Sequence, residues 1–123
     1  LINKISLFRK IGELDKALEI CDRLLKNNTN ETLVLYHKLR ILKKLNRFLE
    51  SNVICKKLLN VYPENGDVLF DMACNFLNMN DNENFLLSLQ KAVNIIPSLK
   101  IKSKNNKEFE AFHNNEKFLK IVS

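Results

Sequence analysis

An internal repeat restricts the fold of this 123-residue chain more than any other feature of its sequence. Its period is the distance along the chain from Pro63 to Pro97, which we call the repeat interval. Cys21, Cys55 and Leu89 are each separated by this same interval. Other columns in the same register contain Leu24, Leu58 and Ala92; Phe8, Leu42 and Phe76; Gly12, Asn46 and Asn80; and Leu35 and Leu69. Such self-similarity predicts stacked copies of one supersecondary unit, each burying its apolar face against its neighbours.

Each period contains two apolar runs at helical spacing, separated by a short polar break. In the middle period these runs predict a first helix over about residues 32–45 and a second over about residues 48–61. The apolar residues behind this prediction are Leu35, Leu39 and Leu42 in the first run and Phe48, Cys55, Leu58 and Leu59 in the second. The whole chain contains only two Gly and two Pro, a composition that favours long helices with short connections.

Residues with special backbone preferences stand where these helices are expected to end. Asn46 lies in the polar break, at the column of Gly12 and Asn80, and both residue types tolerate the left-handed backbone that follows a helix end. Proline cannot continue a helix, so Pro63 and Pro97 are expected to end the second helices of their units. The side chain of Asn65 is expected to cap the helix that follows.

A helix–turn–helix unit with this period, about 34 residues, and with these columns resembles the tetratricopeptide repeat. The first unit reads GELDKALEICDRLL, with Gly12, Ala17 and Cys21 in the family's small and apolar columns, and the next two units end in KLLNVYPEN and KAVNIIPSL. The resemblance covers residues 1–99 and implies an all-α, right-handed superhelical solenoid of three helix pairs. These pairs are expected at residues 1–31 (incomplete at its start), 32–65 and 66–99. Pentatricopeptide repeats, which bind RNA, have a period one residue longer and are disfavoured.

Two positions depart from the family pattern. Phe85 stands in the column of Ala17 and Ser51, where two helices touch closely, so its ring either separates the helices or turns aside. Thr29 stands where the other units carry the terminal proline.

The tail, residues 100–123, is expected to leave the repeat and form capping helices. Phe109 and Phe112 lie one turn apart, and Asn114–Asn115 can end one helix and cap the next. That last helix would carry Phe118, Leu119, Ile121 and Val122. The last repeat of a solenoid exposes an apolar face that must be covered. A ligand-mimicking or swapped segment is the alternative.

The resemblance implies that the first helix of each unit lines a concave groove, which we expect to bind a protein or peptide, with acidic segments of that partner as one candidate for the contact. The predicted groove residues are Tyr36, His37, Arg40, Lys43, Lys44, Phe70, Asp71, Cys74 and Asn78, continued by Ser6, Arg9 and Lys10 of the first unit. Aromatic rings, cations and amides on one wall suit an extended peptide or a helix, and Tyr and Arg are enriched in binding hot spots. The alternative is a solvated face on which Arg40 pairs with Asp71, worth only ~0–1 kcal/mol.

One known tetratricopeptide function is rejected in this register. Some family members hold a partner's terminal carboxylate with Lys, Asn and Arg side chains of the first helices. The corresponding columns here hold Ile2, Ser6, His37, Asp67 and Asp71, and the two aspartates would repel a carboxylate.

No catalytic, metal or cofactor site is expected, because the chain lacks a Gly-rich phosphate loop, a nucleophile elbow and any cluster of metal ligands. His37 and His113 are far apart in sequence. The three cysteines are too few and too irregular for a disulfide framework, which indicates a cytoplasmic protein. We expect Cys21 and Cys55 in the core and Cys74 facing the groove.

The charge distribution supports a rival hypothesis. Residues 32–65 carry seven basic and two acidic residues, and residues 38–47 (KLRILKKLNR) with the lysine-rich 100–107 could bind nucleic-acid phosphates. The acidic balance of residues 66–99 and the absence of Trp disfavour this function. No apolar run approaches the ~20 residues that cross a bilayer.

A third hypothesis is purely architectural, namely a spacer or dimerising end of a longer repeat array. Leu1 is no natural start, so we expect upstream sequence, and its loss would expose an edge around Leu1, Ile5 and Phe8. The residues leave the partner, its pathway and the oligomeric state open.

Overall fold

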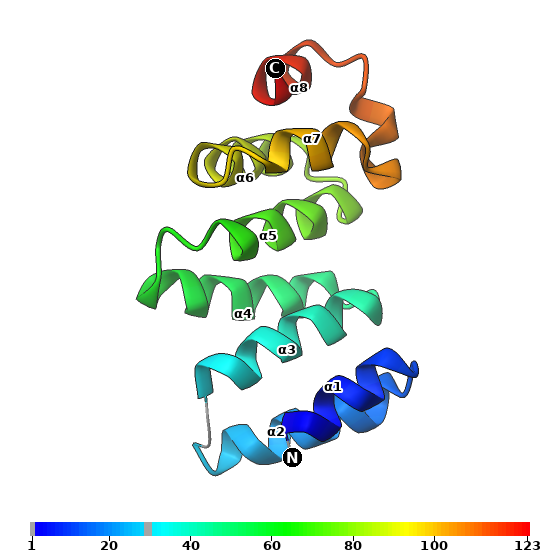
Figure 1. The fold of residues 1–123 in the computed structure, drawn as a ribbon, viewed down its shortest axis with the longest axis vertical. Helices are drawn as coiled ribbons and strands as arrows, with labels where there is room; N and C mark the ends of the chain where they lie inside the picture. Colours follow the sequence, from blue (N-terminus) through cyan, green and yellow to red (C-terminus); the bar gives the residue numbers. More distant parts are fainter. Residues whose placement is uncertain (1, 29–30) are drawn as a thin grey trace. The chain divides into compact units, whose positions relative to one another are not determined.

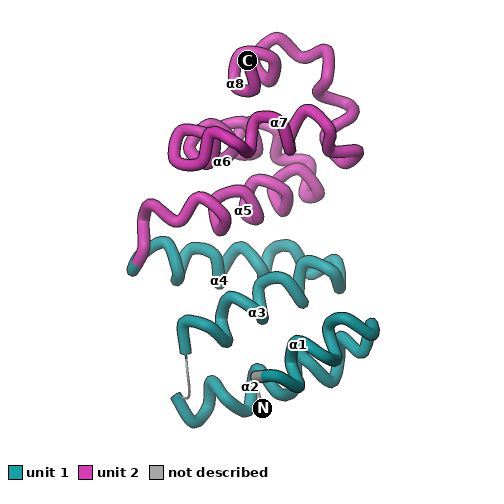
Figure 2. The backbone as a smooth tube through the Cα atoms, in the orientation of Figure 1, with its two compact units in different colours: residues 1–61 teal, residues 62–123 magenta. Residues whose placement is uncertain are grey.

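The computed structural model describes residues 2–28 and 31–123, and its regular structure over these residues is entirely helical (Figure 1). The chain divides into two compact units, Leu1–Val61 (unit 1) and Tyr62–Ser123 (unit 2), which are coloured separately in Figure 2. The all-α fold expected from the sequence is confirmed. Thr29 and Leu1, which entered the sequence argument, lie outside the described residues.

Unit 1 consists of two helix pairs. The helices are α1 (Ile2–Lys10), α2 (Leu14–Lys26), α3 (Glu31–Lys44) and α4 (Phe48–Val61). Each helix contacts the next one along the chain, and α1 also contacts α3. A buried core between them is formed by Ile5, Ala17, Ile20, Cys21, Leu24, Val34 and Ile41. First helices of successive pairs therefore lie against each other within this unit.

Unit 2 contains one further pair and the tail. The pair is α5 (Gly66–Asn78) and α6 (Asn82–Ile95), and the tail forms α7 (Leu99–Lys104), the 3₁₀ helix η1 (Lys107–Phe112) and α8 (Glu116–Val122). The side chain of Asn65 caps α5 by accepting the amide of Val68, and that of Asn115 caps α8 by accepting the amide of Phe118. Both caps are those predicted from the sequence.

The turns between paired helices repeat with the predicted register. Gly12, Asn46 and Asn80 have φ values of 83°, 60° and 61°, so the left-handed backbone expected at this column is confirmed. The next residue in each turn donates its amide to a carbonyl five residues earlier, at 2.8 Å in the first two turns and 2.9 Å in the third. This bond is the signature of the Schellman helix end. One local geometry is thus built three times, each time at the same position of the repeat.

Phe85, the large residue in a small-residue column, turns its ring into the tail. The ring centroid lies 5.0 Å from that of Phe109 and 4.9 Å from that of Phe112, and Phe85 is fully buried. Phe109 and Phe112 also pack against Phe118 of α8. We call Phe70, Phe85, Phe109, Phe112 and Phe118 the aromatic cluster. In the first two units the same column stays small, and the hydroxyl of Ser51 donates to the carbonyl of Leu39 on α3.

The sequence predicts that the tail leaves the repeat, and its last helix nevertheless begins in the repeat register. The second helices α2, α4 and α6 begin at Leu14, Phe48 and Asn82, and α8 begins one further repeat interval later, at Glu116. The segment before α8 departs from the earlier units, because α7 ends at Lys104 and is followed by η1. The tail is therefore built as an irregular first helix followed by a second helix that starts in register.

The apolar edge expected around Leu1, Ile5 and Phe8 is corrected at Ile5. Ile5 is fully buried in the core of unit 1, and Phe8 packs partly against that core. Among the side chains described in α1 and the turn after it, the large apolar ones that are exposed are Leu7 and Ile11. Over the described residues, no helix is long and apolar enough to cross a membrane.

Candidate functional site

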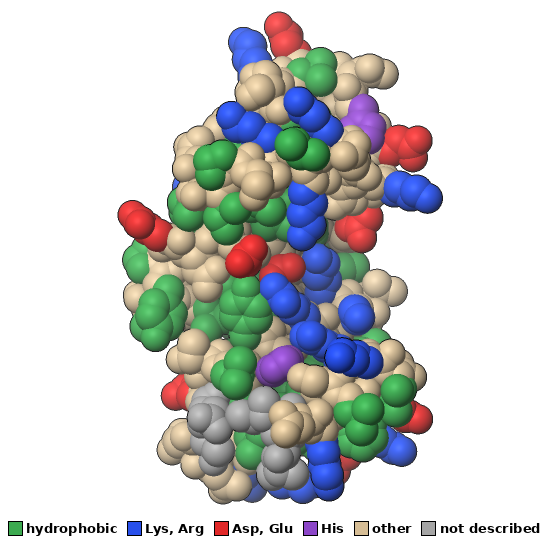
Figure 3. Space-filling view, viewed as in Figure 1, with side chains coloured by type: hydrophobic (Ala, Val, Ile, Leu, Met, Phe, Trp, Pro, Cys, Tyr) green, Lys and Arg blue, Asp and Glu red, His purple; other side chains and the backbone are tan. Residues whose placement is uncertain are grey.

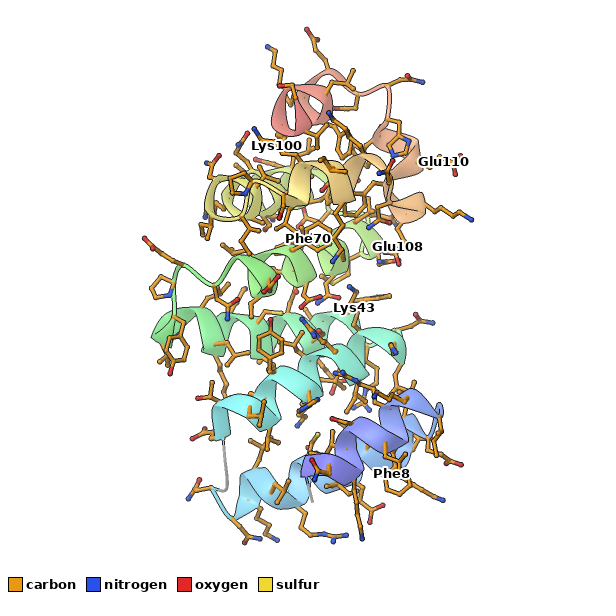
Figure 4. The ribbon with its side chains drawn as sticks, in the orientation of Figure 1. Phe8, Lys43, Phe70, Lys100, Glu108 and Glu110 are labelled. Carbon is orange, nitrogen blue, oxygen red and sulfur yellow. The ribbon has the colours of Figure 1, made fainter. Side chains whose placement is uncertain are left out.

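One face of unit 1 gathers cations and an aromatic ring from two helices. The spacing of Tyr36, His37, Arg40, Lys43 and Lys44 places them along one side of α3. The opposite side is buried and carries Val34, Leu35, Leu39, Ile41 and Leu42. α1 contributes Arg9 to the same face. We call these six residues, Arg9, Tyr36, His37, Arg40, Lys43 and Lys44, the cationic face. Figure 3 shows Lys and Arg side chains gathered on the visible face of the molecule, and Figure 4 labels Lys43 near the C-terminal end of α3.

Direct contacts hold four side chains of this face in place. The guanidinium of Arg40 lies 4.5 Å from the centroid of the Tyr36 ring, and its Nη2 donates to the Tyr36 hydroxyl at 3.2 Å. From α1, Nη1 of Arg9 donates to Nδ1 of His37 at 3.3 Å. Because arginine can only donate, Nδ1 is the acceptor and the proton of the neutral imidazole is on Nε2.

The histidine in this face is held neutral. Burial, together with the guanidinium groups of Arg9 and Arg40, lowers the pKa of His37 below its ordinary value of 6.5. A folded-state pKa below that of the unfolded chain means that the unfolded state binds protons more readily. The contribution of His37 to stability is therefore present above pH 6.5 and is lost as the pH falls from 6.5 through the folded-state pKa.

Replacing Arg9 with Gln is expected to raise the pKa of His37, because it removes a cation that opposes protonation. The measurement is an NMR titration of the His37 imidazole. Lys10→Gln, at the neighbouring exposed position of α1, removes the same charge and is the control, since Lys10 does not contribute to the shift. An unchanged pKa in Arg9→Gln would contradict the assigned geometry.

The other cations of residues 38–47 point to acidic partners instead of joining this face. Nζ of Lys38 lies 2.6 Å from a carboxylate oxygen of Asp22 on α2. The guanidinium of Arg47 donates to both carboxylate oxygens of Glu50, at 2.8 and 2.7 Å. The cations of residues 38–47, predicted as a phosphate-binding patch, therefore do not form one surface. The charges of Lys38 and Arg47 are balanced by the carboxylates of Asp22 and Glu50.

The predicted groove residues of unit 2 are placed differently from the prediction. Phe70 is only 6% exposed, because its ring packs 5.7 Å from that of Phe109 and Nζ of Lys102 lies 5.0 Å from its centroid (Figure 4). Asp71 and Cys74 are 7% and 2% exposed. These three side chains are buried, which corrects their prediction as contact residues. Asn78 is exposed, and its amide donates to the carbonyl of Cys74.

A sequence signal for this burial was present in α5. Between Val68 and Leu77 its only charged residue is Asp71, whereas α3 carries a cation at every turn of its second half. A helix that is apolar on most sides is covered on most sides. The repeat columns alone did not give this result.

The remaining chemistry-bearing residues belong to the core or lie apart. Cys21 and Cys55 are fully buried, as expected. Burial and the nearby Asp22 raise the pKa of Cys21 to about 11, so its thiol stays protonated and unreactive at neutral pH. Across residues 2–28 and 31–123, no three His, Cys, Asp or Glu residues gather in a way that could hold a metal ion.

Comparison with known proteins bears on the fold. No family model matches the chain, and neither does any curated protein sequence. Among solved structures, "MamA 41-end from Desulfovibrio magneticus RS-1" is similar with a TM-score of 0.81 and 17% identity, over 98% of this chain and 71% of that one. The structure described as "MamA RS-1 ArsTM double mutant" is similar with a TM-score of 0.73 and 16% identity, over 98% and 72%. What is shared is the fold. At this identity the likeness supports the helical-repeat architecture and carries no residue-level function.

Proposed function

We propose that this chain is a tetratricopeptide-type module that binds an acidic segment of another protein on the cationic face of unit 1. The observation that carries the proposal is the pre-arranged set of donors on α1 and α3, where Arg40 is fixed on Tyr36 and Arg9 on His37. The family assignment is supported by the helix pairs and their turns, which recur at the repeat interval typical of this repeat class. The role is binding and not catalysis, and the buried cysteines fit a reducing compartment such as the cytoplasm.

The chemistry of the face favours carboxylates. Guanidinium groups form paired, charge-assisted hydrogen bonds with carboxylates, and side chains that are already ordered lose less conformational entropy on binding. The neutral His37 adds an Nε2–H donor, and Lys43 and Lys44 extend the positive potential along α3. An extended or helical peptide with acidic side chains at a spacing of one turn matches this arrangement.

Nucleic-acid binding is the second candidate, because phosphates also seek cations. The pairing of Lys38 with Asp22 and of Arg47 with Glu50 reduces the charge that a phosphate backbone would meet. Binding to random single-stranded DNA at low and moderate salt separates the two candidates, since phosphate binding falls steeply with salt. An absence of binding at low salt excludes this candidate.

Reversing two charges of the cationic face is the test of the proposal. Arg40→Glu with Lys44→Glu is expected to weaken partner binding by more than about 100-fold, because two charge-assisted hydrogen bonds at ~1.5 kcal/mol each are lost and repulsion is added. The partner is captured by the wild-type protein and identified, and affinities are then measured by calorimetry. The unfolding free energy should change by no more than about 1–2 kcal/mol, the worth of the part-buried Arg40–Tyr36 contact.

A matched control reverses the same amount of charge elsewhere in unit 1. Lys56 and Lys57 on α4 are exposed and form no ion pair within the described part of the chain. Lys56→Glu with Lys57→Glu should leave binding within about three-fold of wild type, as expected for exposed charges outside an interface. Equal losses in both double variants would show attraction by net charge alone and would contradict the proposed site.

A further inference from the structure

A hollow of about 880 Å³ lies in unit 2 and shares no residue with the cationic face. It is bordered by the first half of α6, by α8 and by the end of η1. We call it the α6–α8 groove. Its volume lies within the ~300–1,000 Å³ range of sites that bind small molecules or short segments of chain. It opens between two helices that begin at the same position of the repeat.

The floor of the α6–α8 groove is apolar and firmly supported. Leu86, Phe112 and Ile121 line it, and the ring of Phe112 packs on Phe85 and Phe118 of the aromatic cluster. Leu87, which also lines the groove, is 53% exposed. Apolar side chains that line a hollow together with a few polar groups are typical of a binding site.

The two sides of the groove carry opposite charges. α8 contributes Lys117 and Lys120, which lie one turn apart, and α6 contributes Glu83. None of these three side chains forms an ion pair with another described residue of the chain. Glu116, also on the lining, lies at the first residue of α8. The groove thus offers a lysine pair beside one carboxylate on the α8 side and a single carboxylate on the α6 side, with an apolar strip between them.

We infer that the α6–α8 groove binds an amphipathic helix of another protein. The lining residues of α6 run from Asn82 to Gln90, which spans ~12 Å at 1.5 Å per residue, or between two and three helical turns. A helix of that length presents apolar anchors at positions i, i+3 or i+4, and i+7 to such a floor. Charge complementarity requires acidic side chains on the flank over Lys117 and Lys120 and a basic side chain on the flank over Glu83.

A short helix fits this site better than a second copy of the chain. A stable dimer covers ~800 Å² on each partner, whereas this hollow is only about two turns long and is bounded on one side by the seven-residue α8. The groove and the cationic face are thus separate docking sites, and this one does not depend on the proposed function.

The test uses the full chain and two synthetic 15-residue peptides with the same leucine stripe. Peptide 1 has glutamates on one flank of the stripe and lysines on the other, and peptide 2 has lysines on both flanks. Fluorescence anisotropy should show that the wild-type protein binds peptide 1 about ten-fold more tightly than peptide 2. Lys117→Glu with Lys120→Glu should reverse that preference, because the α8 side then carries only carboxylates and no lysine. Leu87→Glu should weaken the binding of peptide 1 by about ten-fold.

Val53→Glu on α4 is the matched control for Leu87→Glu. Val53 occupies the position of Leu87 in the preceding repeat unit and is 55% exposed. Val53→Glu should leave the affinity of the protein for peptide 1 unchanged. The inference is overturned if neither peptide binds, if the lysine variant keeps the wild-type preference, or if Val53→Glu weakens binding as much as Leu87→Glu. Sedimentation that shows a wild-type dimer dissociated by Leu87→Glu would instead assign the groove to a second copy.

Discussion

Replacing Phe109 with alanine is expected to lower the free energy of unfolding of unit 2 by about 3–5 kcal/mol, the range found for large aromatic residues in well-packed cores. Phe109 is fully buried, and its ring lies 5.7, 5.0 and 6.2 Å from the rings of Phe70, Phe85 and Phe118. One ring of η1 thereby connects α5, α6 and α8. Its removal would leave a cavity that these three helices close only by moving, so the loss should be near the upper end of the range.

The measurement is urea unfolding followed by circular dichroism, with hydrogen exchange of the α5 and α8 amides to locate the effect in unit 2. Phe109→Leu keeps most of the volume and should cost less than about 1.5 kcal/mol. Leu119→Ala on α8 removes a side chain that is 48% exposed and should change stability by no more than about 0.5 kcal/mol. A loss below about 1 kcal/mol in Phe109→Ala would show that the aromatic cluster is peripheral to the stability of unit 2.

The helix pairs and their turns could be predicted because they depend on local chemistry. A left-handed residue is needed wherever a Schellman turn ends a helix, and glycine and asparagine adopt that backbone at low cost. Gly12, Asn46 and Asn80 therefore located the turns before any packing was known. The cap at Asn65 followed from similar reasoning, because its side chain satisfies an amide three residues away.

The repeat columns could not predict the burial of Phe70, because it depends on an irregular segment with no counterpart in them; only the apolar composition of α5 indicated that this helix is covered on most sides. The repeat assigns Phe70 to the exposed side of a first helix. In unit 2 that position is covered by Phe109 of η1 and by Lys102 of α7, which are brought there by the fold of the tail. A repeat column describes a position in a helix that packs against identical repeat units. It therefore does not predict the burial of that position where the neighbouring segment differs.

The cationic face was predicted only in part for a related reason. The position of Tyr36, Arg40 and Lys44 along α3 follows from helical spacing alone. The pKa of His37 is lowered first by burial and then by Arg9 and Arg40. Arg9 lies 28 residues earlier and reaches the imidazole only because α1 contacts α3. Such contacts between helices decide the protonation state, whereas the spacing within a helix decides only the side on which a residue lies.

Ala17→Phe is expected to destabilise unit 1 by about 2–3 kcal/mol, although phenylalanine occupies the same repeat column in unit 2. Ala17 is fully buried in the core that contains Ile5 and Ile41, so a ring at this position has no space unless α1 and α2 separate. Phe85 is tolerated because η1 supplies Phe109 and Phe112 as partners for its ring.

Thermal and urea unfolding of Ala17→Phe should be compared with those of Glu19→Phe, which adds the same ring to the exposed side of α2 and should cost less than about 1 kcal/mol. Equal stability of Ala17→Phe and the wild type would mean that the small column is not a packing constraint. The burial of Phe85 would then need an explanation other than the aromatic cluster. Ala17→Phe is expected to lose more stability than Glu19→Phe for the reason that explains Phe85. In both units, the segment packed against a repeat column limits the size of the side chain that the column accepts.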